Sequence, residues 1–333
     1  MSEEVEIEEE MEVTNLPGVG PATKSKLNDA AIYTILDLAT AGPADIADAI
    51  DVDITKAVDL NNKARKKLVE MGRLEPDFIS ASDLLTRRRN ITRLSTGSKN
   101  LDDLLGGGLE TWALTEFYGE FGSGKSQICH TICCTVQLPT DKGGLDGGAV
   151  YIDTEGTFRP ERLAQIAEAR GMNAEEVLSR VMVARAYNSA HQELIVKDLG
   201  RILEKNKVKL VVVDSAVAHY RAEFLGRGTL AERQQRLNRF MHQLLRTAEI
   251  YNIAVVLTNQ VQAAPDTFFG DPTRATGGHV VAHTSTYRVY LRKAGKNRIG
   301  RMMDSPYHPE MDVVFMIDEK GVDDPPEESS KRR

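Results

Sequence analysis

The chain has 333 residues, 41% hydrophobic and 27% charged, which suits one large or two unequal globular domains and includes no run of 18 apolar residues that could span a membrane. Its net charge of −7 comes from the start of the chain, because residues 1–12 hold seven Glu and no base and leave 42 acidic residues against 42 basic ones. That acidic start predicts no secretory signal peptide, and the neutral remainder neither indicates nor excludes nucleic acid as a partner.

The first predicted elements are helical. Residues 1–12 form an acidic tail that we expect to be disordered, and residues 13–72 predict a small helical domain. Within it, 16–42 predicts a helix, a tight glycine turn and a second helix, and two more helices are predicted at 44–50 and 54–72. Residues 73–92 then predict a linker with a short amphipathic piece.

From about residue 93 the pattern changes to alternating strands and helices. Apolar runs predict strands at 113–118, 149–153, 180–185, 209–214 and 253–258, and later strands, open to antiparallel pairing, at 286–293 and 312–317. Helices are predicted at 126–138, 160–170, 190–206 and 230–252. This alternation predicts an α/β fold with a mainly parallel sheet covered by helices over 93–321. Residues 322–333 are predicted to form a polar C-terminal tail.

The stretch GEFGSGKS at 119–126 has the spacing of a loop that wraps phosphates. Its glycines let backbone N–H groups converge on phosphate, Lys125 adds positive charge, and the Ser126 hydroxyl can ligate Mg²⁺. A predicted strand precedes it and a predicted helix follows, which puts the phosphate at a helix N-terminus. ATP and Mg²⁺ are therefore the expected cofactors. The expected nucleotide contacts are Gly119, Glu120, Phe121, Gly122, Ser123, Gly124, Lys125, Ser126 and Gln127.

Carboxylates follow two of the predicted strands. Asp214 ends the apolar run KLVVVD, at the edge where α/β sheets bind ligands, and can hold Mg²⁺ directly or through water. Glu155, just past another strand, can polarise the water that attacks the γ-phosphate. Asp153 is the alternative candidate, and it could instead help to position the metal through the groups that bind it. Either acid could also simply cap a helix.

Three cysteines, Cys129, Cys133 and Cys134, crowd the helix behind the phosphate loop. A metal site would use Cys129 and Cys133, one turn apart. We favour small buried apolar side chains, because no second Cys/His cluster completes a ligand set. Cysteine use of this kind fits a reducing cytoplasm.

Several further stretches resemble the RecA/RadA family of strand-exchange recombinases, above all its archaeal members. They are LPGVGPAT, GEFGSGKSQ, YIDTEGTFRPERL, VVVDSAVAHYRAEFLGRGTLAERQQRL, TNQVQAAPDTFFGDPT, GGHVVAHTSTYRVYLRK and DSPYHPE. The phosphate loop is common to many ATPases, whereas FRPER, GRGTLAERQ and the NQV…GG…AH block are far more specific. The resemblance implies a RecA-like P-loop ATPase core, preceded by a small all-helical helix-hairpin-helix domain.

The resemblance also implies roles at the nucleotide. Glu155 would be the catalytic carboxylate, with Lys125 and Gln260 as its catalytic partners, Gln260 reporting the γ-phosphate to the loop that follows. Arg159 would stack on the adenine, as a planar guanidinium can. Three residues would reach nucleotide across a subunit boundary, the last two capping the ATP of a neighbour: His283, Asp304 and Pro309.

Two loops would face DNA. The first, about 220–233, carries Arg221, Arg227 and Arg233, and the second, about 261–280, carries Arg274 together with Phe268 and Phe269. Arginines would grip phosphates without identifying bases, and an apolar side chain could wedge between stretched bases. The alternative is a solvated basic face. The sequence departs from the family at Ala264, where a base is common, and at Ala275-Thr276, where Pro-Ile is common.

The N-terminal LPGVG resembles a helix-hairpin-helix, whose amides at Gly18 and Gly20 would point at a DNA phosphate with Lys24 and Lys26 nearby; such hairpins also serve as protein contacts. Phe78 and Ala81 in DFISAS match the Phe-x-x-Ala linker that docks on the next subunit and gives rings or filaments. The alternative is that Phe78 anchors the linker on its own core.

The function implied is that of a DNA-dependent ATPase whose ATP-bound filaments on single-stranded DNA pair it with homologous duplex in recombinational repair. Expected partners are single-stranded and double-stranded DNA, further copies of the chain and, as a further class, mediator proteins. We expect it in the cytoplasm with the nucleoid and at no membrane. Two alternatives stay open: a related ATPase acting as a helicase or recombination mediator, and a repair adaptor that binds ATP without turnover.

Overall fold

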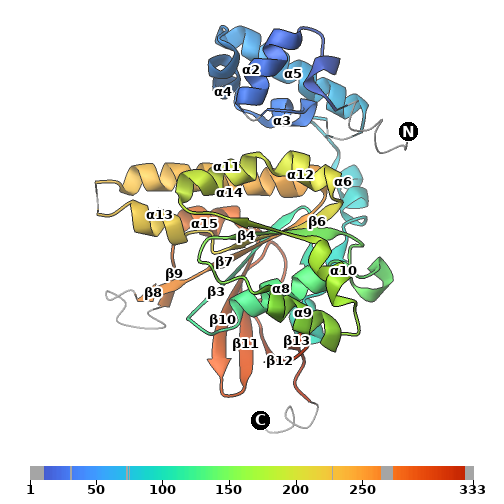
Figure 1. Cartoon of the computed structure of the whole chain (residues 1–333), viewed down its shortest axis with the longest axis vertical. Helices are drawn as coiled ribbons and strands as arrows, with labels where there is room; N and C mark the ends of the chain where they lie inside the picture. The colour runs from blue at the N-terminus through green and yellow to red at the C-terminus, as the bar shows by residue number, and fades with distance from the viewer. Residues whose placement is uncertain are drawn as a thin grey trace. The chain divides into compact units, whose positions relative to one another are not determined.

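The structure is a computed structural model, and it describes residues 11–30, 32–72, 74, 76–226, 228–263 and 273–326. The chain divides into two compact units, Met1–Asn90 and Ile91–Arg333, whose elements are labelled in Figure 1. The boundary between the units falls inside the stretch predicted as a linker.

The N-terminal unit is helical, as predicted. Its described helices are α2 (Pro21–Asp29), α3 (Ile35–Thr40), α4 (Pro43–Ile50), α5 (Ile54–Glu70) and α6 (Ala81–Arg88), after a 3-10 turn η1 (Val13–Asn15). Proline opens α2 and α4, where its missing N–H is not needed. Thr34 and Asp37 cap α3 reciprocally, each side chain accepting from the other's backbone N–H. The helices α2 to α5 bury a small apolar core: Leu27, Ile35, Leu38, Ile46 and Leu68.

The C-terminal unit is built on one large sheet. Among the described residues this sheet has nine strands, in the order β13-β12-β11-β10-β3-β7-β6-β4-β5. The strands from β10 to β5 run parallel, and β11, β12 and β13 add antiparallel. Their bounds are β3 (Ala113–Gly119), β4 (Gly148–Asp153), β5 (Val181–Arg185), β6 (Val208–Asp214), β7 (Ala254–Asn259), β10 (Tyr287–Ala294), β11 (Asn297–Asp304), β12 (Asp312–Asp318) and β13 (Gly321–Asp323).

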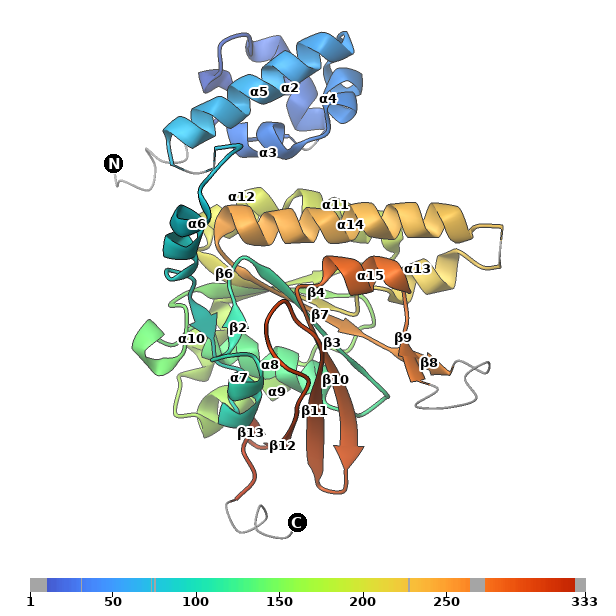
Figure 2. The same cartoon turned by 180° about the vertical axis from the view of Figure 1, so that it is seen from behind.

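Two short antiparallel pairs lie outside the large sheet. One joins β1 (Arg93–Leu94) to β2 (Leu109–Glu110), and the other joins β8 (Val261–Ala263) to β9 (Thr273–Ala275). The second pair directly follows β7 and precedes α15, and Figure 2 shows it near α15 and α13. It therefore forms the described base of the predicted second loop, of which residues 264–272 lie outside the described residues.

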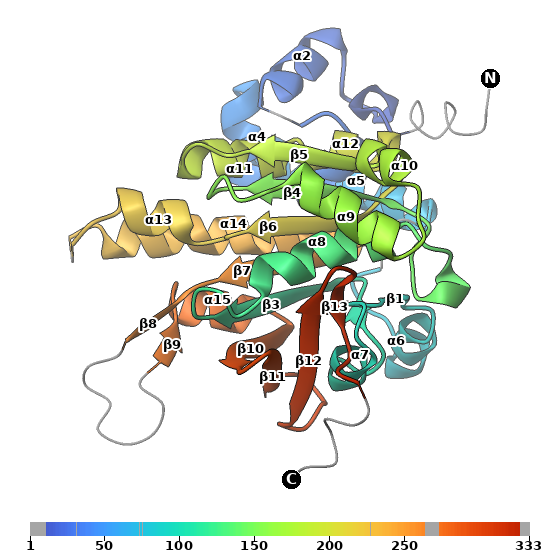
Figure 3. The ribbon, with the colours of Figure 1, turned by 60° about the horizontal axis from the view of Figure 1, so that its bottom comes forward.

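Helices cover both faces of the sheet (Figures 1 and 3). They are α7 (Lys99–Leu104), α8 (Lys125–Thr135), α9 (Pro160–Ala169), α10 (Ala174–Ser179), α11 (Ser189–Lys197), α12 (Leu199–Lys205), α13 (Ala218–Glu223), α14 (Leu230–Tyr251) and α15 (His279–Thr284), with a 3-10 turn η2 (Thr140–Lys142). Side chains alternate along the central strands: Tyr151 and Val212 pack with α8 and α9, and Val150 and Val213 pack with α12 and α14. This alternation gives two apolar cores and confirms the predicted α/β class.

The structure corrects several predicted elements. The helix predicted at 126–138 ends at Thr135, and the helix predicted at 190–206 is two helices, α11 and α12, separated by Asp198. Strand β10 is parallel to β3, whereas β12 is the antiparallel addition. Strand β11 was not predicted at all. It returns from β10 through a turn at Gly295, whose φ of 64° favours glycine.

The three cysteines are fully buried on α8 and free, which confirms the prediction of small apolar side chains. Burial raises the pKa of Cys129 and Cys133 well above the ordinary thiol value and that of Cys134 to about 12. In the part of the chain that the structure describes, no helix is long and apolar enough to cross a membrane.

Candidate functional site

The phosphate loop lies between the end of β3 at Gly119 and the start of α8 at Lys125, as predicted. Gly124 caps α8 with a φ of 112°, a value that a side chain rarely allows. Gly119 lies so close to β10 that an added Cβ would stand 2.1 Å from the carbonyl oxygen of Leu291. The loop borders a cavity of about 800 Å³, which Lys125 and Ser126 line from the helix side.

The ammonium group of Lys125 is bonded to the backbone of its own loop. Its Nζ donates to the carbonyl oxygens of Gly119 and Glu120, at 2.8 and 2.9 Å. Burial lowers its pKa, and the negative charges of Asp214 and Glu155 oppose that shift. A phosphate could take over these hydrogen bonds, so the lysine suits a β- or γ-phosphate.

Asp214 stands at the end of β6 and lines the same cavity as Ser126. It is 4% exposed, and both oxygens accept hydrogen bonds: Oδ2 from the Tyr151 hydroxyl at 2.6 Å and Oδ1 from the Thr258 hydroxyl. Neutral hydroxyls orient the carboxylate and leave its charge intact. A hydroxyl and a carboxylate facing one cavity are oxygen donors of the kind that Mg²⁺ takes, together with phosphate oxygens and water.

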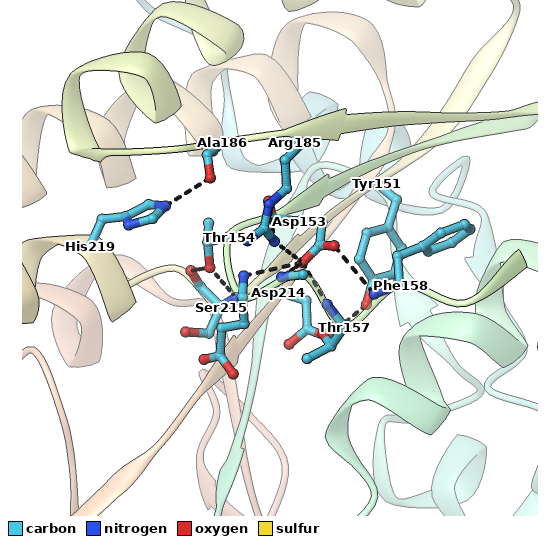
Figure 4. Close-up of polar contacts among 12 residues, drawn as sticks. Tyr151, Asp153, Thr154, Thr157, Phe158, Arg185, Ala186, Asp214, Ser215 and His219 are labelled. Atoms are coloured by element: carbon cyan, nitrogen blue, oxygen red, sulfur yellow. Dashed lines mark hydrogen bonds and ion pairs between the residues drawn. The ribbon is translucent and has the colours of Figure 1, made fainter.

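Asp153, the rival acid, is fully occupied in holding the loop after β4 (Figure 4). Its Oδ1 accepts from the backbone N–H groups of Glu155, Gly156 and Thr157 at 2.7–3.2 Å, and its Oδ2 from that of Phe158 at 3.3 Å. Arg185 pairs with the same carboxylate at 3.1 Å. Asp153 therefore shapes the loop that presents its neighbour Glu155.

Glu155 lines the cavity and contacts the residue after β7. Its Oε1 accepts a hydrogen bond from Gln260 Nε2 at 3.0 Å, although the two are 105 positions apart in the chain. Thr154 fixes the other side of this loop, because its hydroxyl exchanges hydrogen bonds with the Ser215 backbone at 2.8 and 2.9 Å (Figure 4). The predicted catalytic set of Glu155, Lys125 and Gln260 thus borders one cavity.

The sequence prediction missed His130. This side chain on α8 is 2% exposed and stacks on Phe158, with ring centroids 5.1 Å apart. Its Nδ1 lies 2.7 Å from the Ser126 carbonyl oxygen, and its Nε2 accepts from the Arg159 N–H at 3.2 Å. One nitrogen must donate and the other accept, so the ring is neutral with its proton on Nδ1. Burial accordingly lowers its pKa.

The prediction also missed two cations, Lys293 and Arg298, which line the cavity from β10 and β11. Arg298 was missed because β11 was missed, whereas Lys293 lies in the strand that was predicted at 286–293 but was given no role there. A signal was present in the turn residue Gly295 between two runs that alternate apolar and basic residues.

The remaining predicted nucleotide contacts are not all gathered at this cavity. Ser123 is buried within the loop and does not line the cavity, whereas Phe121 lines it with a fully exposed side chain. The Arg159 guanidinium donates to the carbonyl oxygens of Gly156 and Phe158. Three residues lie elsewhere and do not line the cavity: His283 in α15, Asp304 at the end of β11, and Pro309 between β11 and β12.

The predicted first DNA loop is shorter than expected. Helix α13 extends to Glu223 and α14 begins at Leu230, so Arg221 and Arg233 lie on helices on either side of the turn. Arg227 and the side chain of Arg274 lie outside the described residues, as do Phe268, Phe269 and Ala264.

At the N-terminal hairpin, Gly18 has a φ of 103° and Gly20 caps α2. Lys24 pairs with Glu12 at 2.7 Å, and Lys26 donates to the Ile50 carbonyl oxygen.

Phe78 is 93% exposed, so it does not anchor the linker on the core of its own unit, and Ala81 opens α6.

Comparison with protein families matches residues 87–325 to the family described as Rad51. The chain belongs to the Rad51 family. This Rad51-family chain is 50% identical over 317 residues to the "DNA repair and recombination protein RadA" of Cenarchaeum symbiosum, covering 95% of this chain and 80% of that relative. It is 51% identical over 315 residues to the protein of the same name from Aeropyrum pernix, covering 94% and 97%.

Proposed function

We propose that this chain is a DNA-dependent ATPase and strand-exchange recombinase, which assembles on single-stranded DNA with ATP and pairs it with a homologous duplex. The observation that carries the proposal is the cavity where the phosphate loop, Asp214, Glu155 and Gln260 meet, with Gln260 leading directly into the β8–β9 pair. The two relatives named for recombination and repair, similar along nearly the whole chain, support it.

ATP would bind with its phosphates on the loop 119–126. Lys125 would stabilise charge on the transferring phosphate, and Ser126 and Asp214 would hold Mg²⁺, which neutralises phosphate charge when bound. Glu155 would polarise the attacking water. Gln260 now bonds to Glu155, and it would exchange this partner for the γ-phosphate, which links nucleotide state to the segment that follows.

Assembly would be head to tail. Strand β5 is the last strand of the large sheet, at the end opposite β13, and its Met182 and Val183 side chains are 36% and 46% exposed (Figure 3). An edge strand can take up one more strand from another chain. The exposed Phe78, with Ala81, would supply that strand and its anchor from a neighbouring copy, and rings or filaments result from such a contact.

The subunit boundary would also complete the nucleotide site. His283, Asp304 and Pro309 do not line the cavity of their own chain, which fits a role at the ATP of a neighbour. Arg159 would stack on the adenine between the two copies. The arginines at 221, 227, 233 and 274 would bind DNA phosphates, and Gly18 and Gly20 would contact duplex DNA.

A D-loop assay tests the proposal. Single-stranded DNA, ATP and Mg²⁺ are mixed with protein and either a homologous or a heterologous duplex. We expect joint molecules with the homologous duplex alone. Unwinding of duplex without pairing would favour a helicase, stimulation of another recombinase without pairing would favour a mediator, and ATP binding without phosphate release would favour an adaptor. We expect the protein in the cytoplasm with the nucleoid.

A further inference from the structure

A buried polar network lies where β7 passes into the β8–β9 pair. Its centre is Asn259, the last residue of β7, which is fully buried. Glu116 on β3 is also fully buried, and Arg288 on β10, with its side chain 15% exposed, donates Nε–H to Glu116 Oε2 at 2.6 Å. A buried ion pair adds little stability compared with apolar side chains, so this one calls for another explanation.

The Asn259 carboxamide uses its whole hydrogen-bonding capacity. Its Nδ2 donates to Glu116 Oε1 and to the Thr276 carbonyl oxygen, both at 2.7 Å. Its Oδ1 accepts from the Gln260 N–H at 2.8 Å and from the Thr276 hydroxyl. Because a carboxylate can only accept, Glu116 fixes which side of the amide faces β3 and turns the oxygen toward Gln260. The ion pair thus orients Asn259.

This network joins both ends of one segment. Gln260 immediately precedes β8 and Thr276 immediately follows β9, and Thr276 N–H also donates to the Gln260 carbonyl oxygen at 2.9 Å. We call Glu116, Asn259, Thr276 and Arg288 the Asn259 clasp. The backbone that it holds belongs to the residue whose side chain reaches Glu155.

Thr276 is where the sequence departs from the Pro-Ile pair common in the family, and the hydroxyl is what that departure contributes. Thr276 is 2% exposed, so its hydroxyl has no water to bond in place of Asn259. A valine at this position would keep the shape and leave Asn259 Oδ1 with one donor. The structure therefore offers a way to weaken the clasp without touching the cavity.

We propose that Thr276, acting through Asn259, is a positioning residue for Gln260, and that the Asn259 clasp transmits a displacement of the β8–β9 pair to Glu155. The inference rests on the proposed function, in which that pair lies at the base of a DNA-binding loop. When DNA displaces Thr276, Asn259 and the Gln260 backbone move with it, and the hydrogen bond from Gln260 to Glu155 changes. The DNA-stimulated part of hydrolysis then depends on the Thr276 hydroxyl, whereas ATP binding does not.

The test measures steady-state ATP hydrolysis with and without single-stranded DNA in wild type, Thr276→Val, Thr276→Ser and Thr247→Val. Thr247 is the matched control, because its buried hydroxyl bonds only within α14, to the Gln243 carbonyl oxygen. We expect Thr276→Val to lower the ratio of DNA-stimulated to DNA-free rate by about fivefold, the factor that one neutral hydrogen bond contributes to an equilibrium. The KM for ATP should stay unchanged, and Thr276→Ser should restore the ratio.

The outcomes separate this inference from the proposed function. A wild-type rate that single-stranded DNA leaves unchanged would overturn both. Normal stimulation of the wild type together with an equal ratio in Thr276→Val would overturn the clasp alone, and so would an equal loss in Thr247→Val. Unfolded protein lowers both rates of a variant and cancels in the ratio, so poor folding cannot imitate the expected result.

Discussion

Glu155→Gln should abolish turnover while leaving nucleotide binding intact. The amide keeps the shape of the side chain and can still accept the hydrogen bond from Gln260 Nε2. That bond is solvent-exposed, and its complete loss would contribute about 1 kcal/mol or less, a factor of about five. Loss of general-base assistance typically lowers kcat by about 100- to 10,000-fold, which is about 3 to 5 kcal/mol on the barrier. The chemical effect therefore dominates over the structural one.

Single-turnover phosphate release measures the turnover of Glu155→Gln, and equilibrium binding of a fluorescent ATP analogue measures its nucleotide affinity. Asp153→Asn is the contrasting variant, because it removes the charge that holds four backbone N–H groups and Arg185. We expect that variant to lose thermal stability together with activity. Turnover of Glu155→Gln within tenfold of wild type, or failure to bind ATP, would refute the assignment of Glu155 as the base.

Three further expectations follow from described residues. Phe78→Ala should give smaller assemblies in light scattering, since truncating a docked ring costs about 3–5 kcal/mol at each joint. The melting temperature should stay constant, because the Phe78 side chain is exposed in the single chain. Leu85→Ala, which changes another exposed side chain, is the control, and unchanged assembly size in Phe78→Ala would exclude the linker as the joint. Burial lowers the pKa of His130 in the folded chain, so as the pH falls the unfolded chain binds this proton before the folded chain does. The contribution of the neutral ring to the free energy of unfolding is therefore fully present above a pH of about 6.5 and decreases below it, by at most about 1.4 kcal/mol per pH unit. Urea unfolding at pH 7.5 and 5.5 should show a smaller acid loss in His130→Gln, and an equal loss would contradict the neutral ring. Arg221→Ala should reduce the slope of log affinity against log salt for single-stranded DNA by about 0.7 or less, equally on two unrelated sequences. The affinity is measured by fluorescence anisotropy, and an effect confined to one of the two sequences would refute phosphate binding by Arg221.

The predictable part of the site lies in contiguous motifs and strand ends. The phosphate loop is local in sequence, and Asp214 and Glu155 follow apolar strands whose carboxyl ends must meet at one sheet edge. The mainly parallel sheet and its covering of helices follow from the same alternation, whereas the strand order was not predicted. These features need no long-range information beyond the strand pattern.

The parts that were missed depend on distant partners. His130 is an ordinary mid-helix residue until folding places Arg159 against it, and the Asn259 clasp joins residues from four separate segments. No glycine or proline comes just before the break at Asp198 to signal it in the sequence. Both α11 and α12 pack against α14, but α11 also contacts α13 whereas α12 also contacts β6. Strand β11 was missed because its apolar alternation is short and its exposed positions mix a base, an apolar residue and an acid: Arg301, Met303 and Asp304.

The burial of the native thiols makes the protein suitable for site-specific labelling. All three cysteines lie beneath the sheet, and their raised pKa values keep them protonated at neutral pH, so maleimide reagents that need an accessible thiolate should pass them by. Leu225, which is 74% exposed in the turn between α13 and α14, is a position where one introduced cysteine would react alone. A fluorophore attached there could follow the arrival of DNA in real time without any native cysteine being replaced.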